Sequence, residues 1–211
     1  MKEAISLSLY SYWNALRGTR PAPKRFEIEP SRIATNLPDT FILERVNPAN
    51  TRFRLAGSRI IETLGRELRG KNLFDLFDVE DAVMLRDRME LITSHCAVGL
   101  FRMSADDGAG LTATFELLIM PLVHTGDAVE RFLGCIVPMD APSWLGTVPL
   151  VNLKLTDNEV IWPDGRVSAN ACQIDYQSPV LPMRRAARIV RSNRRQFRVY
   201  EGGLSSSAEE R

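Results

Sequence analysis

The densest cluster of one chemical type in this sequence is a tract of seven arginines between positions 184 and 198. No acidic residue lies between Gln177 and Tyr200 to neutralise them. Guanidinium groups bind phosphate and carboxylate oxygens, so the tract could bind nucleic acid, anionic lipid, a phosphorylated nucleotide or an acidic protein surface. A solvated basic tail is the alternative. We expect an interaction element, with contacts from Arg188, Arg191, Arg194 and Arg195.

Residues that could catalyse a reaction form no recognisable pattern. The sequence has no Gly-x-Ser-x-Gly, Walker A or Gly-x-Gly-x-x-Gly motif, and no Cys or His pair has metal-ligand spacing. Asp75, Asp78, Glu80 and Asp81 are close together, but carboxylates there are typical of a capped helix start. We therefore predict that the protein is not an enzyme, has no catalytic residues and binds no metal. An enzyme with an unrecognised site in the C-terminal part is the rival hypothesis.

Hydrophobic spacing predicts the elements that position these groups. Phe53 and Leu55 alternate with Arg52 and Arg54, which favours a strand that buries both apolar residues on one face. Gly57 follows, where we expect a sharp turn with positive φ. Residues 80 to 95 have the apolar period of a helix. Polar turns separate the other expected strands, at 40–46, 99–105, 111–123 and 131–139.

Residues 3 to 17 form a predicted amphipathic helix with Leu9, Trp13 and Leu16 along one stripe. A lone helix leaves such a stripe exposed, so we expect it to join two copies of the chain into a homodimer. The alternative is that the helix folds back on its own sheet.

A series of short motifs resembles a known family. The chain has Tyr12-Trp13, Leu16-Arg17-Gly18 and Pro23-Lys24-Arg25, then Pro30 and Leu37-Pro38. Phe53-Arg54-Leu55-Ala56-Gly57 and Gly65-Arg66-Glu67-Leu68-Arg69-Gly70 follow. In this order they resemble the PAS_5 group of PAS domains common in alphaproteobacteria, over about residues 8 to 140. The resemblance implies an α+β PAS fold, with a five-stranded antiparallel sheet and helices on one face. It also implies a regulatory role in bacterial signalling, through sensing or protein docking.

A PAS core encloses a space between its sheet and its helices, which could hold a small ligand. The residues that we expect to line it are the apolar positions on the inward-facing side of each predicted helix or strand: Leu55, Leu64, Phe74, Phe77, Leu85, Met89, Phe115, Leu117 and Leu133. The alternative is a fully packed core without a ligand. Haem is not expected, because His95 and Cys96 lie at a helix end and His124 at a hairpin tip. A flavin is not expected either, since the Asn-Cys-Arg-Phe-Leu-Gln motif of flavin-binding PAS domains is missing. The cofactor is therefore unknown.

Composition sets the remaining expectations. The 211 residues carry a net charge of +1, and no apolar run approaches the ~20 residues of a membrane helix. We expect a cytoplasmic protein with an N-terminal helix and connector (1–30), a PAS domain (31–140) and a basic, partly ordered extension (141–211). In the extension, 151–155 and 159–162 could pair as two strands. Nucleic acid is a possible partner through the arginine tract, and we hold it as an alternative to protein docking.

Overall fold

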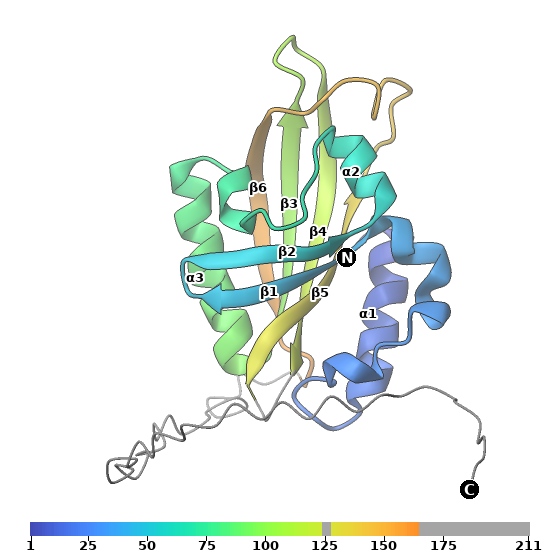
Figure 1. Ribbon diagram of the computed structural model, residues 1–211, viewed down its shortest axis with the longest axis vertical. Helices are drawn as coiled ribbons and strands as arrows, with labels where there is room; N and C mark the ends of the chain where they lie inside the picture. Colours follow the sequence, from blue (N-terminus) through green and yellow to red (C-terminus); the bar gives the residue numbers. More distant parts are fainter. Residues whose placement is uncertain (124–127, 165–211) are drawn as a thin grey trace, which may run out of the picture. The chain divides into compact units, whose positions relative to one another are not determined.

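A six-stranded antiparallel sheet is the centre of the structure, with strand order β2-β1-β5-β4-β3-β6. Figure 1 shows it in a computed structural model that describes residues 1–123 and 128–164. The strands are β1 (Thr40–Asn47), β2 (Asn50–Ala56), β3 (Val98–Asp106), β4 (Thr112–Val123), β5 (Val129–Pro138) and β6 (Asn152–Ile161). The mixed helix-and-strand fold confirms the predicted class, with six strands in place of the five expected.

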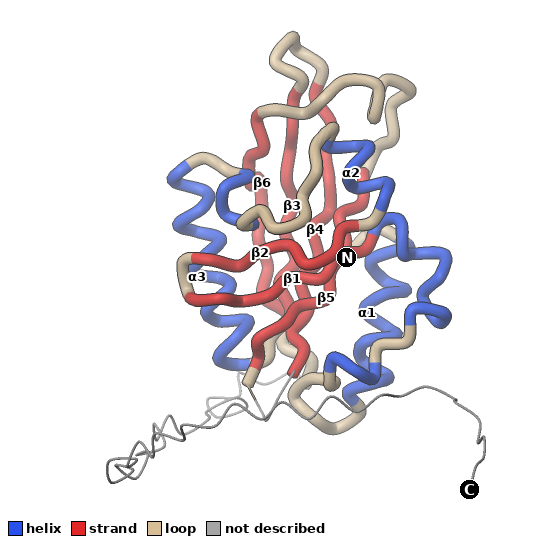
Figure 2. The backbone as a smooth tube through the Cα atoms, viewed as in Figure 1, coloured by secondary structure: helices blue, strands red, loops and turns tan. Residues whose placement is uncertain are grey.

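In the part of the chain that the structure describes, three α-helices and three 3₁₀ helices accompany the sheet (Figure 2). They are α1 (Ala4–Arg17), α2 (Ser58–Leu64), α3 (Val79–His95), η1 (Arg25–Glu27), η2 (Pro30–Asp39) and η3 (Leu73–Leu76). Helix α3 begins where the Asp78 side chain accepts a 2.9 Å hydrogen bond from the Asp81 backbone N–H, and this cap agrees with the acidic helix start expected from sequence. None of these helices is long and apolar enough to cross a membrane.

The sixth strand comes from the part of the chain that we assigned to the extension. Residues 151–155 and 159–162 do not form a hairpin, because Asn152–Ile161 is one strand that pairs with β3. Leu150 and Leu153 are buried, and the Leu155 backbone N–H donates a 2.7 Å hydrogen bond to Asp81 at the start of α3. Burial of these leucines favours joining the main sheet over a separate two-stranded hairpin.

The two faces of the sheet are covered by different helices. Cross-strand partners point to the same face. Ile42, Leu133 and Met120 are successive partners on one face, and Leu43 and Phe132 lie on the other. Helix α1 packs on the Ile42 face, where the Ser6 hydroxyl lies 3.6 Å from the Cys135 sulfur. Helix α3 packs on the opposite face, and Figure 1 shows α1 and α3 on either side of the strands.

A β-bulge in β2 overturns the expectation that Phe53 and Leu55 share a buried face. Leu55 pairs with Ile42, but Phe53 pairs with Leu43, so Arg54 is the extra residue. An extra residue reverses the alternation beyond it. Phe53 is consequently fully buried, while Leu55 is 55% exposed on the Ile42 face.

Helix α1 does not present the apolar stripe that we expected to be exposed. Leu9 and Trp13 are fully buried and Leu16 is half-buried against the core. The backbone N–H of Lys2 donates a 2.8 Å hydrogen bond to the buried carboxylate of Glu116 in β4. The helix therefore folds back on its own sheet, as in the alternative, and its stripe is not available to a second copy.

Gly57 is constrained by its neighbours and not by a positive φ. Its φ is −68°, which any residue adopts. A Cβ atom there would lie 2.2 Å from the carbonyl oxygen of Pro38 and 2.3 Å from that of Leu37. The expected left-handed turn is wrong; glycine is needed because η2 crosses the start of α2 at very short range.

Candidate functional site

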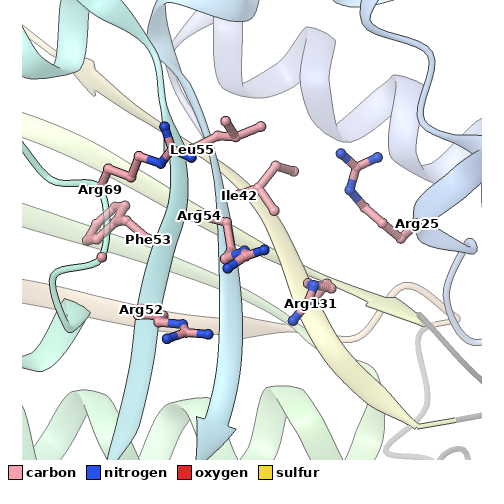
Figure 3. Close-up of a pocket in the computed structure, with 9 residues that line it drawn as sticks. Arg25, Ile42, Arg52, Phe53, Arg54, Leu55, Arg69 and Arg131 are labelled. Atoms are coloured by element: carbon pink, nitrogen blue, oxygen red, sulfur yellow. The ribbon is translucent and has the colours of Figure 1, made fainter. Parts of the chain in front are cut away.

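Five arginines surround a hollow of about 480 Å³ over the β2-β1-β5 end of the sheet. They come from four segments of the chain, with two of them in β2, and are shown in Figure 3: Arg25, Arg52, Arg54, Arg69 and Arg131. The apolar part of the lining includes Ile42 and Leu55, which are cross-strand partners. Figure 3 shows these two side chains between Arg69 on one side and Arg25 on the other.

One carboxylate organises three of these arginines. Oε1 of Glu44 lies 2.6 Å from Nη1 of Arg131, and Oε2 lies 2.7 Å from Nη2 of Arg52 and 3.4 Å from Nη1 of Arg54. Arg131 and Arg52 flank Glu44 directly, because each is its cross-strand partner in a neighbouring strand. Arg54 reaches the same carboxylate from the bulge, and re-aiming a side chain is a common effect of a bulge.

Glu44 is ionised at neutral pH. Burial of its carboxyl group would by itself raise the pKa, but hydrogen bonds and charge interactions from Arg52 and Arg131 outweigh this effect and lower the pKa below its usual value. The side chain of Glu44 is only 15% exposed, so little water competes for these contacts. The carboxylate is thus a fixed negative anchor for three guanidinium groups.

The hollow keeps a strong excess of positive charge. Arg25 and Arg69 make no ion pair with any residue of the ranges 1–123 and 128–164. Glu44 supplies one negative charge to its three arginines. Guanidinium groups gathered in this way can bind anionic oxygens in bidentate geometry.

A second, mostly apolar hollow of about 240 Å³ adjoins the first and shares Arg25, Ile42 and Leu55 with it. Residues of η2 and the preceding connector form its far wall, among them Ile28, Ile33 and Leu37. Together the hollows make a surface with a cationic end and an apolar end.

The residues that we expected around an internal cavity do not lie on a single face. Leu55 and Leu133 are on the Ile42 face and line the second hollow. The others lie in the core or against it: Leu64, Phe74, Leu85, Met89, Phe115 and Leu117 are buried, and Phe77 is half-buried. Leu117 pairs with Ile136 and Phe101 on the face covered by α3. The bulge moves Leu55 to the Ile42 face, and Leu133 shares that face as a cross-strand partner of Ile42.

The remaining candidates from the sequence are the arginine tract and the histidines. The tract with Arg188, Arg191, Arg194 and Arg195 lies outside the described residues, as does His124. The ring of His95 contacts that of Trp162 edge-on, with centroids 5.6 Å apart. Within the described part of the chain, no three His, Cys, Asp or Glu side chains gather in a group that could hold a metal ion.

The Cys135 thiol is a poor nucleophile at neutral pH. It is fully buried, and burial raises the pKa of its thiol to about 12. Because the thiolate is the reactive form, a thiol with this pKa is inert near pH 7.

Sequence reasoning missed the arginine-lined hollow. The alternation Arg52-Phe53-Arg54-Leu55 was the available signal, because it places two arginines close together on one strand. Arg25, Arg69 and Arg131 gave no signal, since they are far from β2 in sequence and meet it only through the fold.

Comparison with known proteins agrees with this architecture. A family model described as PAS domain, PAS_5, matches residues 1–137. None of the curated proteins matches the chain. The family match confirms the resemblance inferred from the motifs between Tyr12 and Gly70.

Proposed function

Because the chain belongs to the PAS_5 family of PAS domains, we propose that it is a non-catalytic regulator that docks on a signalling partner through the outer face of its sheet. The outer face is here the part of the Ile42 face at the β2-β1-β5 end of the sheet, where the two hollows lie. PAS domains are in general sensory and regulatory modules, and many of them mediate protein contacts. The finer assignment to one face rests on the geometry of this chain.

The observation that carries this proposal is the exposed apolar surface beside the arginines. Leu55 and Leu37 are 55% and 39% exposed and line the same hollow, and an exposed apolar patch with a polar rim is typical of an interaction site. Charged groups around an apolar centre are typical of protein contact sites. The N-terminal helix is a weaker candidate for docking, since its stripe of Leu9 and Trp13 is buried.

Site-specific photo-cross-linking tests this proposal. A benzophenone amino acid placed at position 55 should capture a discrete partner protein in a native lysate. The matched control carries the same amino acid at position 83, because Val83 on α3 is 49% exposed and lies away from the hollows. The proposal fails when position 55 yields no discrete product, or when both positions yield the same products.

Binding of nucleic acid through the C-terminal arginine tract is the second candidate. Its support is the unneutralised charge of that tract in the sequence. The full chain should then bind random duplex DNA in a salt-sensitive way. Replacement of four arginines with glutamine should abolish this binding: Arg188, Arg191, Arg194 and Arg195. An unchanged affinity would remove this candidate.

A further inference from the structure

We propose that the arginine-lined hollow binds a small organic phosphate of nucleotide size, with at least two phosphate groups and a planar aromatic ring. This names a ligand class for the hollow on the Ile42 face. The regulatory role of such a ligand rests on the proposed function. Binding itself is measurable on the purified protein, independently of any partner.

The charge of the hollow favours a ligand with several anionic oxygens. Five arginines line it, and the ion pairs that they make within the described ranges all go to Glu44. That carboxylate leaves most of the positive charge uncompensated. Arg25, Arg69 and Arg54 are the least constrained, because Arg25 and Arg69 have no ion pair among the described residues and Arg54 has only the 3.4 Å contact. A compact polyphosphate could reach guanidinium groups from different segments at once.

The size and floor of the hollow favour a ligand that also has an apolar part. A volume of about 480 Å³ falls within the range of roughly 300–1,000 Å³ that is common for small-molecule sites. Ile42 and Leu55 form an apolar surface between the arginines (Figure 3). A planar ring lying on Leu55 would cover a side chain that is otherwise 55% exposed.

An acidic peptide added as an extra strand is a poorer fit. β2 is at the edge of the sheet, but its backbone is already bonded beside the hollow. The Phe53 backbone N–H donates to the carbonyl of Lys71 at 2.9 Å, and the Gly70 N–H donates to the carbonyl of Phe53 at 2.8 Å. Strand addition needs these same groups, so they are not available to a peptide at this position.

Isothermal titration of the purified full-length chain tests the inference. The probes are adenosine 5′-triphosphate, inorganic triphosphate and adenosine, each in low and in high salt. We expect one equivalent of adenosine triphosphate to bind, more weakly as salt increases. Inorganic triphosphate should bind more weakly because it lacks the ring, and adenosine should show no measurable binding because it lacks the charge.

Variants locate the site. Arg25→Gln and Arg54→Gln should each weaken binding of adenosine triphosphate by about tenfold, the usual effect of losing a charge-assisted contact. Arg102→Gln is the matched control, since it removes the same charge from β3, where Arg102 faces Asp157 away from the hollow. Leu55→Glu adds an opposing charge at an exposed position without removing an arginine, and should abolish binding. Glutamine at Arg188, Arg191, Arg194 and Arg195 should leave the affinity unchanged.

Three results would overturn the inference. The first is that adenosine triphosphate does not bind in low salt, and the second is that the Arg25 and Arg54 variants bind it with unchanged affinity. The third is that replacing the C-terminal arginines alone abolishes binding. Stronger binding of a polyglutamate peptide or of single-stranded DNA would show that the ligand class is wrong. None of these results depends on the cross-linking experiment, so failure of the ligand and failure of the docking proposal are separate findings.

Discussion

The indole Nε1 of Trp13 donates a 2.8 Å hydrogen bond to the carbonyl oxygen of Pro121, which joins helix α1 to strand β4. Trp13 is fully buried, so its ring packs in the core while its one polar atom is satisfied. The guanidinium of Arg17 lies 5.7 Å from the centroid of the same ring. The N-terminal helix is in this way an integral part of the fold.

Replacing Trp13 should strongly destabilise the protein. Trp13→Ala removes a fully buried ring and should cost about 3–5 kcal/mol of unfolding free energy. Trp13→Phe should cost about 1–3 kcal/mol, because the Pro121 carbonyl loses its partner. Urea denaturation followed by circular dichroism measures both. The control is Leu7→Ala on the same helix, where the side chain is 47% exposed; an equal loss in all three variants would contradict the finding.

Gly57→Ala should destabilise the fold although φ is ordinary at this position. The added Cβ would meet the carbonyl oxygens of Pro38 and Leu37 at 2.2 and 2.3 Å, and backbone atoms do not move aside cheaply. We expect a loss of about 1–3 kcal/mol, as for other overpacked sites. Chemical denaturation compares it with Ser58→Ala, an exposed neighbour that should change stability by less than about 0.5 kcal/mol. An unchanged midpoint for Gly57→Ala would mean that η2 moves away from α2.

Glu44 should make stability depend on acidic pH. Its pKa in the folded state is lowered, so the contribution of its ion pairs is present above its unfolded pKa of about 4.3 and is lost as pH falls through the folded value. At pH 7, Glu44→Gln should therefore be less stable than the original chain. The difference between their urea midpoints should shrink as pH falls below about 4. A difference that stays constant from pH 7 to pH 3 would exclude this role.

Strand β6 should contribute to the stability of the whole sheet. Leu153 is 3% exposed, and Leu153→Ala should cost about 2–5 kcal/mol because it leaves a buried space. Val151→Ala is the control, since Val151 is 52% exposed and should change stability by less than about 0.5 kcal/mol. Thermal unfolding distinguishes the two. Similar small effects for both would indicate that the sheet is stable without its sixth strand.

Several elements could be predicted from local sequence because their signals lie within a few residues. The expected helix at 80–95 is observed as Val79–His95, with the Asp78 cap at its start. The strands at 40–46, 99–105, 111–123 and 131–139 are each observed within two residues of their predicted bounds. Apolar spacing and turn residues determine these elements directly. The motifs between Tyr12 and Gly70 likewise identified the family.

Only the tertiary structure decided where the apolar stripe of α1 packs, which face Leu55 occupies and where the arginines meet. Amphipathic spacing indicates that Leu9 and Trp13 are buried against another surface. A second copy of the chain and the protein's own sheet are equally compatible with that spacing. The bulge at Arg54 depends on pairing with β1, which no period within β2 reveals. Arg25, Arg69 and Arg131 converge on β2 because η1, the loop before η3 and β5 fold around it. Contacts between distant segments depend on how whole elements pack, whereas periodicity records only which side of one element is apolar.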